Sequence, residues 1–121
     1  MKPNWIAIGA GWGALAVLLG AFGAHGLKSR VSPADLEIWH TGVQYHALHA
    51  IALVLFGLFQ ERRATNSCPG WVFFLGSFIF SGTLYGIVLG GPRWLGAITP
   101  FGGVALIVAW VWFAVLAVRG R

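Results

Sequence analysis

The stretch that decides the fold is Thr41 to Phe59, TGVQYHALHAIALVLFGLF, in which two histidines three residues apart run directly into an apolar segment. About 18 or more apolar residues are enough to cross the ~30 Å hydrocarbon core of a bilayer as a helix. His46 and His49 are then carried towards the membrane interior, where titratable side chains are costly to desolvate. Such residues mark either a functional site or a hydrogen bond between helices.

Three other segments have the same apolar character, so we expect an all-α fold: one integral membrane bundle of four transmembrane helices over residues 1–121. Each segment holds roughly 18 to 23 residues, enough to span the bilayer. In lipid each must be helical, because unpaired backbone groups find no water to bond. The expected helices are about 5–27, 33–59, 71–89 and 100–118.

Proline signals place two of these helix starts. Ser32-Pro33 offers a capping hydroxyl followed by proline at the first helical position, so the second helix should start well before its apolar part. Thr99-Pro100 repeats the pattern, and we expect 93–98 to be a short interfacial connection. Lys2 and the apolar run up to Ala21 also resemble a signal peptide, but about 20 residues is long for one, and we expect the run to remain as the first span.

The composition excludes several classes of protein. With 58% hydrophobic and 9% charged residues, the chain lies far from soluble proteins, in which about a quarter of residues are charged. The formal net charge of +5 is scattered at the ends of apolar runs, so we expect a lipid bilayer as the partner and no nucleic acid. The single cysteine excludes a thiolate-rich metal site.

The distribution of basic residues predicts the topology. An even number of spans puts both termini on one side, and that side holds five of the eight basic residues. By the positive-inside rule, both termini are expected in the cytoplasm of a bacterium, with the chain in its inner membrane. The five are Lys2, Arg62, Arg63, Arg119 and Arg121; the other side has Lys28, Arg30 and Arg93.

Small residues recur at four-residue spacing in the first and third segments. Such faces allow helix backbones to approach closely where the hydrophobic effect does not help. We therefore expect helix packing, within the chain or in a homo-oligomer or larger membrane complex. The packing candidates are Gly9, Gly13, Gly20, Gly82 and Gly86.

Polar residues of several segments suggest a shared pocket. At 100° per residue, His46 and His49 share a face of the second helix, and His25 ends the first. Helix 3 brings Ser81 and Tyr85 and helix 4 begins at Thr99, so all six side chains could line a pocket in the outer leaflet. The alternatives are a hydrogen-bonded joint between helices, a proton or small-solute site, and a metal or haem site.

The chemistry argues against catalysis and against a metal. His46 and His49 suit zinc or copper as a pair, but a closed site needs about four ligands and no carboxylate is near. The acids Asp35, Glu37 and Glu61 all lie outside the expected hydrocarbon, so no carboxylate pair is available for acid-base work there. We expect no enzyme, no cofactor and no metal.

Four blocks of the sequence resemble the domain of unknown function 423 family, small bacterial inner-membrane proteins of the YgdD and YwdK type, which are similar to transmembrane protein 256. The blocks are LGAFGAHGL (19–27), GVQYHALHA (42–50), FSGTLY (80–85) and ITPFGG (98–103). The resemblance implies four membrane helices and no established activity. The family pattern allows glutamine or methionine in place of His46, so it shifts weight to His25, His49, Tyr85 and Thr99.

Two functions remain at this point. The first is a non-enzymatic membrane protein that acts through helix packing, as an oligomer or an accessory subunit. The second is an oligomeric transporter or channel for a cation, proton or small solute, with His25 and His49 in its pocket. The small-residue faces favour the first. All four histidines fall between residues 25 and 49, on the expected non-cytoplasmic side, which favours the second.

Overall fold

The first two helices begin at side-chain caps. The computed structural model describes residues 2–119. Before α1 (Trp5–Phe22), Asn4 Oδ1 accepts a hydrogen bond from the Ala7 N–H at 3.0 Å. Before α2 (Pro33–Arg62), Ser32 Oγ accepts from the Asp35 N–H at 3.1 Å, and Pro33 occupies the first turn, where its missing N–H costs nothing. The expected start at Pro33 therefore agrees with the structure.

The first span ends where the sequence predicted, and α2 runs three residues beyond its expected end at 59. α1 continues into a π-helical turn, η1 (Gly23–Leu27), so that the two together cover the expected span. At this turn Trp39 of α2 packs against Gly23, and its indole Nε1 donates to the Leu19 carbonyl at 2.8 Å. The bond gives a carbonyl at the π-turn an additional donor and fixes the end of α1 on α2.

The helices α3 (Cys68–Val88) and α4 (Leu95–Arg119) start earlier than the expected positions 71 and 100. α4 begins at Leu95 and contains Pro100 in its interior, so the connection expected over 93–98 is wrong from Leu95 onwards. Thr99 Oγ1 bonds back to the Leu95 carbonyl at 3.2 Å, and the proline near the helix start removes only the bond to the Gly96 carbonyl. Thr99 is therefore a residue inside the helix and not its cap.

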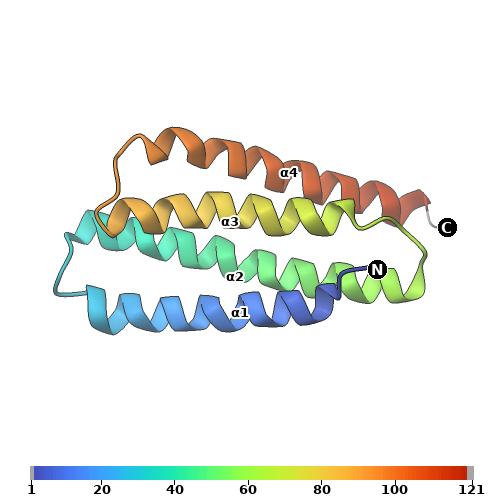
Figure 1. Ribbon diagram of the computed structural model, residues 1–121, viewed down its shortest axis with the longest axis horizontal. Coiled ribbons are helices and arrows are strands. Elements are labelled where there is room, and N and C mark those ends of the chain that lie inside the picture. The colour runs from blue at the N-terminus through green and yellow to red at the C-terminus, as the bar shows by residue number, and fades with distance from the viewer. Residues whose placement is uncertain (1, 120–121) are drawn as a thin grey trace.

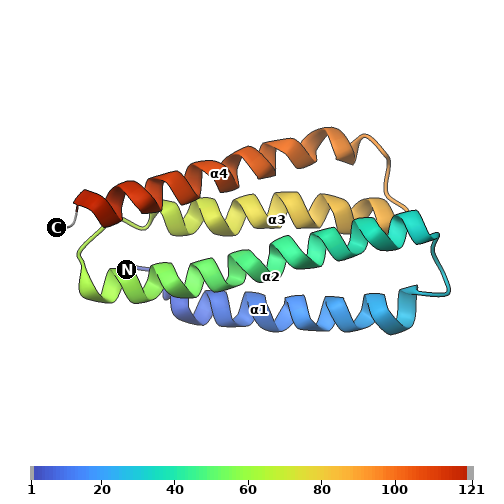
Figure 2. The same ribbon diagram turned by 180° about the vertical axis from the view of Figure 1, so that it is seen from behind.

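The four helices lie side by side in chain order (Figure 1), and the view from behind shows the same arrangement (Figure 2). α1 packs on α2, α2 on α3, and α3 on α4, with α1 and α4 at opposite edges. All four are long and apolar enough to cross a membrane, which confirms the expected four-helix transmembrane bundle.

Both ends of the described chain lie at one end of the bundle, called here the terminal end (Figure 1). The same end holds the α2–α3 loop, and the opposite end holds the other two loops. Arg121, one of the basic residues counted above, lies outside the described residues.

An aromatic core fills the terminal half of the bundle. Leu53 and Phe56 of α2, Phe73 of α3 and Ala109 of α4 are each fully buried. Phe113 of α4 joins this core, with its ring centroid 5.4 Å from that of Phe56 at an interplanar angle of 88°. Edge-to-face packing of this kind joins the two central helices to α4.

Glycines set the closest helix approaches. A Cβ atom on Gly9 would lie 2.8 Å from the Ala50 carbonyl oxygen of α2, and one on Gly102 would lie 2.6 Å from the Phe80 nitrogen of α3. Gly9 is one of the expected packing residues, whereas Gly102 belongs to none of the four-residue repeats. Gly82, expected in packing, has no heavy atom within 4 Å of its Cβ position among the described residues.

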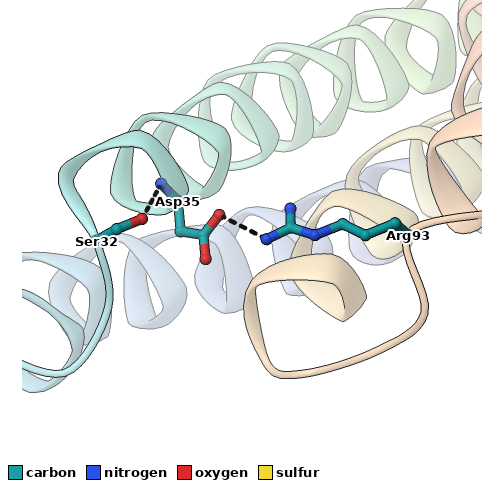
Figure 3. A network of polar contacts seen from close by, with 3 residues as sticks. All are labelled: Ser32, Asp35 and Arg93. Atoms are coloured by element: carbon teal, nitrogen blue, oxygen red, sulfur yellow. Dashed lines mark hydrogen bonds and ion pairs between the residues drawn. The ribbon is translucent and has the colours of Figure 1, made fainter.

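At each end of the bundle an arginine side chain joins two segments of the chain. At the opposite end Arg93 Nη2 lies 3.4 Å from Asp35 Oδ1, which ties the α3–α4 loop to the first turn of α2 (Figure 3). At the terminal end Arg63 Nη1 donates to the Ala117 carbonyl in the last turn of α4 at 3.2 Å. The second contact satisfies a carbonyl that has no donor within its own helix.

Candidate functional site

His49 lies near the middle of α2 with both ring nitrogens engaged. Its Nδ1 is 2.7 Å from the Tyr45 carbonyl oxygen, and Trp110 Nε1 of α4 donates to its Nε2 at 3.0 Å. An indole N–H only donates and a carbonyl only accepts. The ring must therefore be neutral, with its proton on Nδ1. A metal ion or a second proton at Nε2 would have to displace Trp110.

His46 has one partner and one unpaired nitrogen. Its Nδ1 is 2.9 Å from the Tyr85 hydroxyl of α3, and its ring stacks on Trp12 of α1 with centroids 3.9 Å apart. The side chain is fully buried, and its Nε2 has no hydrogen-bond partner among the described residues. Among the six candidate residues, His46 alone has a buried side-chain nitrogen or oxygen without a partner.

The serines of α3 are bonded to neighbouring helices. Ser81 Oγ donates to the Gly42 carbonyl of α2 at 2.7 Å. Trp12 Nε1 of α1 donates to Ser77 Oγ at 3.0 Å, and Ser77 in turn lies 3.0 Å from the Phe74 carbonyl of its own helix. Polar bonds thus join α1 to α3, α3 to α2 and α2 to α4. We call this set the polar seam: Trp12, His46, His49, Ser77, Ser81, Tyr85 and Trp110.

Two of the expected site residues lie apart from the polar seam. Thr99 bonds Thr83 at 2.7 Å between their hydroxyl oxygens, joining α4 to α3. His25 is exposed in the middle of η1. The antiparallel packing that sets Gly23 against Trp39 places His25 roughly 18 Å along the bundle from His49. The structure therefore brings His46, His49, Tyr85 and Ser81 into one seam and leaves His25 and Thr99 outside it.

Sequence reasoning missed the tryptophans as partners. Trp12, Trp39 and Trp110 each donate an indole hydrogen bond to another helix. Their positions inside the spans, away from the interfacial tryptophan belt, were the available signal. An indole N–H at membrane depth needs an acceptor. Ser77 accepts from Trp12, His49 accepts from Trp110, and the Leu19 backbone carbonyl accepts from Trp39.

The arrangement suits a structural joint better than a reactive site. Within residues 2–119 no group of three or more His, Cys, Asp or Glu residues is placed to hold a metal ion. His46 and His49 are 0% and 2% exposed, so neither ring opens onto a surface pocket. Both expected alternatives that need access, a solute site and a metal site, would require the seam to open.

Comparisons with known proteins agree with the sequence blocks. The family model described as "Protein of unknown function (DUF423)" matches residues 19–103. The UPF0382 membrane protein YwdK of Bacillus subtilis (strain 168) is 43% identical over 118 residues, covering 95% of this chain and 96% of that protein. The UPF0382 membrane protein SERP0230 of Staphylococcus epidermidis (strain ATCC 35984) is 41% identical over 108 residues, covering 88% of each chain. No solved structure matches. The resemblance to this family is confirmed, and the names of the family and of these relatives state no activity.

Proposed function

The chain belongs to the DUF423 family of membrane proteins of unknown function, and from that premise we propose that it is a non-catalytic, multi-pass subunit of the bacterial cytoplasmic membrane. It acts through helix packing, either with further copies of itself or within a larger membrane complex. The observation that carries the proposal is that the buried polar side chains of the polar seam bond to other helices. The seam residues bond mostly to one another and to backbone carbonyls, and so join helices.

The edge helices provide the surface for association. α4 packs mainly on α3, and its outer face presents a row of large apolar side chains, including Ile107, Val111 and Val115. In lipid the hydrophobic effect does not drive two such faces together, so the association of helices would depend on complementary shape and close van der Waals contact. This supports a partner that is another membrane helix and not a soluble protein.

Cross-linking between copies tests the proposal. In a Cys68→Ser background, Val111→Cys places a single thiol on the outer face of α4, and Gly11→Cys places one on the exposed face of α1. We expect disulfide-linked dimers in native-lipid nanodiscs from at least one of these variants, whereas Ser29→Cys in the α1–α2 loop serves as the control. A protein that remains monomeric at all protein-to-lipid ratios and co-purifies with no membrane partner contradicts the proposal.

The orientation is proposed from the basic residues. Lys2, Arg62, Arg63 and Arg119 lie at the terminal end, against Lys28, Arg30 and Arg93 at the opposite end. With this bias the terminal end faces the cytoplasm. Cys68, the native thiol, is exposed at the terminal end. It should react with a membrane-impermeant maleimide in inverted vesicles but not in intact cells, and the reverse pattern would overturn the orientation.

The alternative is an oligomeric transporter or channel for a cation, proton or small solute. The unpaired Nε2 of His46 is the observation that favours it, because a buried polar atom without a partner is costly and sometimes functional. Proteoliposome flux that is lost in His46→Leu but kept in His25→Ala would support this alternative. A wild-type protein that carries no flux of protons or monovalent cations would exclude it.

A further inference from the structure

Two hollows, which together we call the furrow, follow the contact line between α1 and α2 from the terminal end towards the middle of the bundle. Its inner part is a groove of about 330 Å³ lined by apolar side chains and glycines, among them Ala10 and Val17 of α1 and Ala47 and Val54 of α2. Its outer part is a pocket of about 240 Å³ lined by residues 2–4 before α1, by Trp5 and Ile6 of α1, and by Gly57, Gln60 and Glu61 of α2. Because Ile6 packs on Gly57 and Gly9 on Val54, the two parts follow one antiparallel contact line.

The outer pocket contains opposite charges that do not pair. Lys2 and Glu61 both line it, yet among residues 2–119 neither takes part in an ion pair. Trp5 on the inner wall is 1% exposed, and its indole ring packs against Gly70 of α3, so its Nε1 is buried away from the pocket. The pocket therefore presents one cation and one anion, unpaired among residues 2–119, at the edge of the bilayer.

The pocket also has a fixed wall. Gln60 Nε2 donates to the Thr65 and Asn66 carbonyls of the α2–α3 loop at 3.1 and 3.2 Å. These bonds hold the last turn of α2, which carries Glu61, against the loop. The backbone wall of the pocket is therefore preformed, and the ordering cost of binding falls mainly on the exposed Lys2 and Glu61 side chains.

The length of the furrow favours a lipid over a helix. From Ile6 and Gly57 to Val17 and Ala47 it runs ten or eleven residues, about 16 Å at 1.5 Å per residue. One leaflet of a bilayer has a hydrocarbon depth of about 15 Å, half of the ~30 Å core. The lining of the groove ends at this point. A partner helix would need a groove across both leaflets.

From these features we propose that the furrow binds one phospholipid with a zwitterionic aminophospholipid headgroup, of the phosphatidylethanolamine class, from the leaflet at the terminal end. The acyl chain lies against Ala10, Ala47 and Val54. The phosphate meets the Lys2 ammonium, and the primary ammonium of the headgroup donates to the Glu61 carboxylate. A choline headgroup cannot donate such a bond, and an anionic glycerol headgroup brings no cation for Glu61.

The test is native mass spectrometry of the full-length protein, delipidated in detergent and titrated with phosphatidylethanolamine, phosphatidylcholine or phosphatidylglycerol. We expect the wild type to bind phosphatidylethanolamine about three- to tenfold more tightly than either other lipid, because one partly exposed charged hydrogen bond separates them. Equal binding of all three lipids, or a preference for phosphatidylglycerol, overturns the proposal.

Matched variants test the headgroup contact and the acyl-chain contact separately. Glu61→Gln should remove the preference over phosphatidylcholine, while Arg62→Gln, an exposed neighbour that does not line the pocket, should keep it. Ala10→Leu should weaken the binding of all three lipids by filling the groove, while Ala14→Leu, also exposed on α1 but outside the groove, should not. If Ala10→Leu and Ala14→Leu bind lipid alike while circular dichroism shows both folded, the furrow is not the site. The oligomer proposed above is not needed for this result.

Discussion

Trp110 of α4 donates its indole hydrogen to His49 Nε2 of α2 across 3.0 Å, and this bond fixes the tautomer of the imidazole. The bond joins two helices that are not neighbours in the chain. It also turns a titratable group at membrane depth into a neutral acceptor, which explains how the chain tolerates it there.

The first prediction concerns this bond. Trp110→Phe keeps an aromatic ring but removes the donor, so the free energy of unfolding should fall by about 1 kcal/mol, the usual size of an interhelical hydrogen bond in a membrane. Steric trapping or SDS unfolding in mixed micelles measures it. Trp112→Phe is the control, because Trp112 makes no described side-chain hydrogen bond. Equal losses in the two variants would show that ring packing, and not the hydrogen bond, stabilises this contact.

The second prediction concerns the tautomers of the two buried histidines. His49 should carry its proton on Nδ1. His46 should carry it on Nε2, because the Tyr85 hydroxyl has no other acceptor among the described residues and therefore donates to Nδ1. Nitrogen NMR of histidine-labelled protein in nanodiscs distinguishes the two forms. The same tautomer at both positions would contradict the hydrogen-bond scheme.

The third prediction compares two histidines that the sequence grouped together. His25 is exposed, so His25→Ala should change the free energy of unfolding by less than about 0.5 kcal/mol. His49→Ala should lower it by about 2 kcal/mol or more, because it leaves a cavity and removes the acceptor of Trp110. Similar losses in both variants would mean that the two residues share one site after all.

The fourth prediction uses two glycines. Gly9→Ala places a methyl group against the α2 backbone, which cannot move aside, so the unfolding free energy should fall by about 1–3 kcal/mol. Gly82→Ala has open space around it and should be neutral or slightly stabilising, since alanine favours the helix. If Gly9→Ala proved neutral in the same unfolding assay, α1 would not be packed on α2 as described.

Much of the fold could be predicted from the sequence, because span length and backbone satisfaction in lipid leave few choices. The four spans and the shared side of the termini follow from apolar run length alone. The start of α4 could not be predicted, since Thr99-Pro100 has the same local pattern as Ser32-Pro33. Only the Thr99 bond to Leu95 and the packing on α3 show that the helix continues through the proline.

Less of the candidate site than of the fold could be predicted from the sequence. The shared face of His46 and His49 follows from helical periodicity, and both are buried. Their partners depend on which helices meet and at what height, which one sequence does not specify. The close approach at Gly102 could not be predicted for a related reason. A single glycine is enough to let α4 contact the α3 backbone at Phe80, and no repeat of small residues marks the position.

The location of both chain ends at one end of the bundle has a practical consequence (Figure 1). Two copies can be joined, Arg119 of the first towards Lys2 of the second, by a flexible linker that never re-enters the bilayer. Such a covalent tandem fixes stoichiometry at two and allows a single copy to carry a substitution. Asymmetric variants of the α4 face and the α1–α2 furrow could then be compared within one molecule.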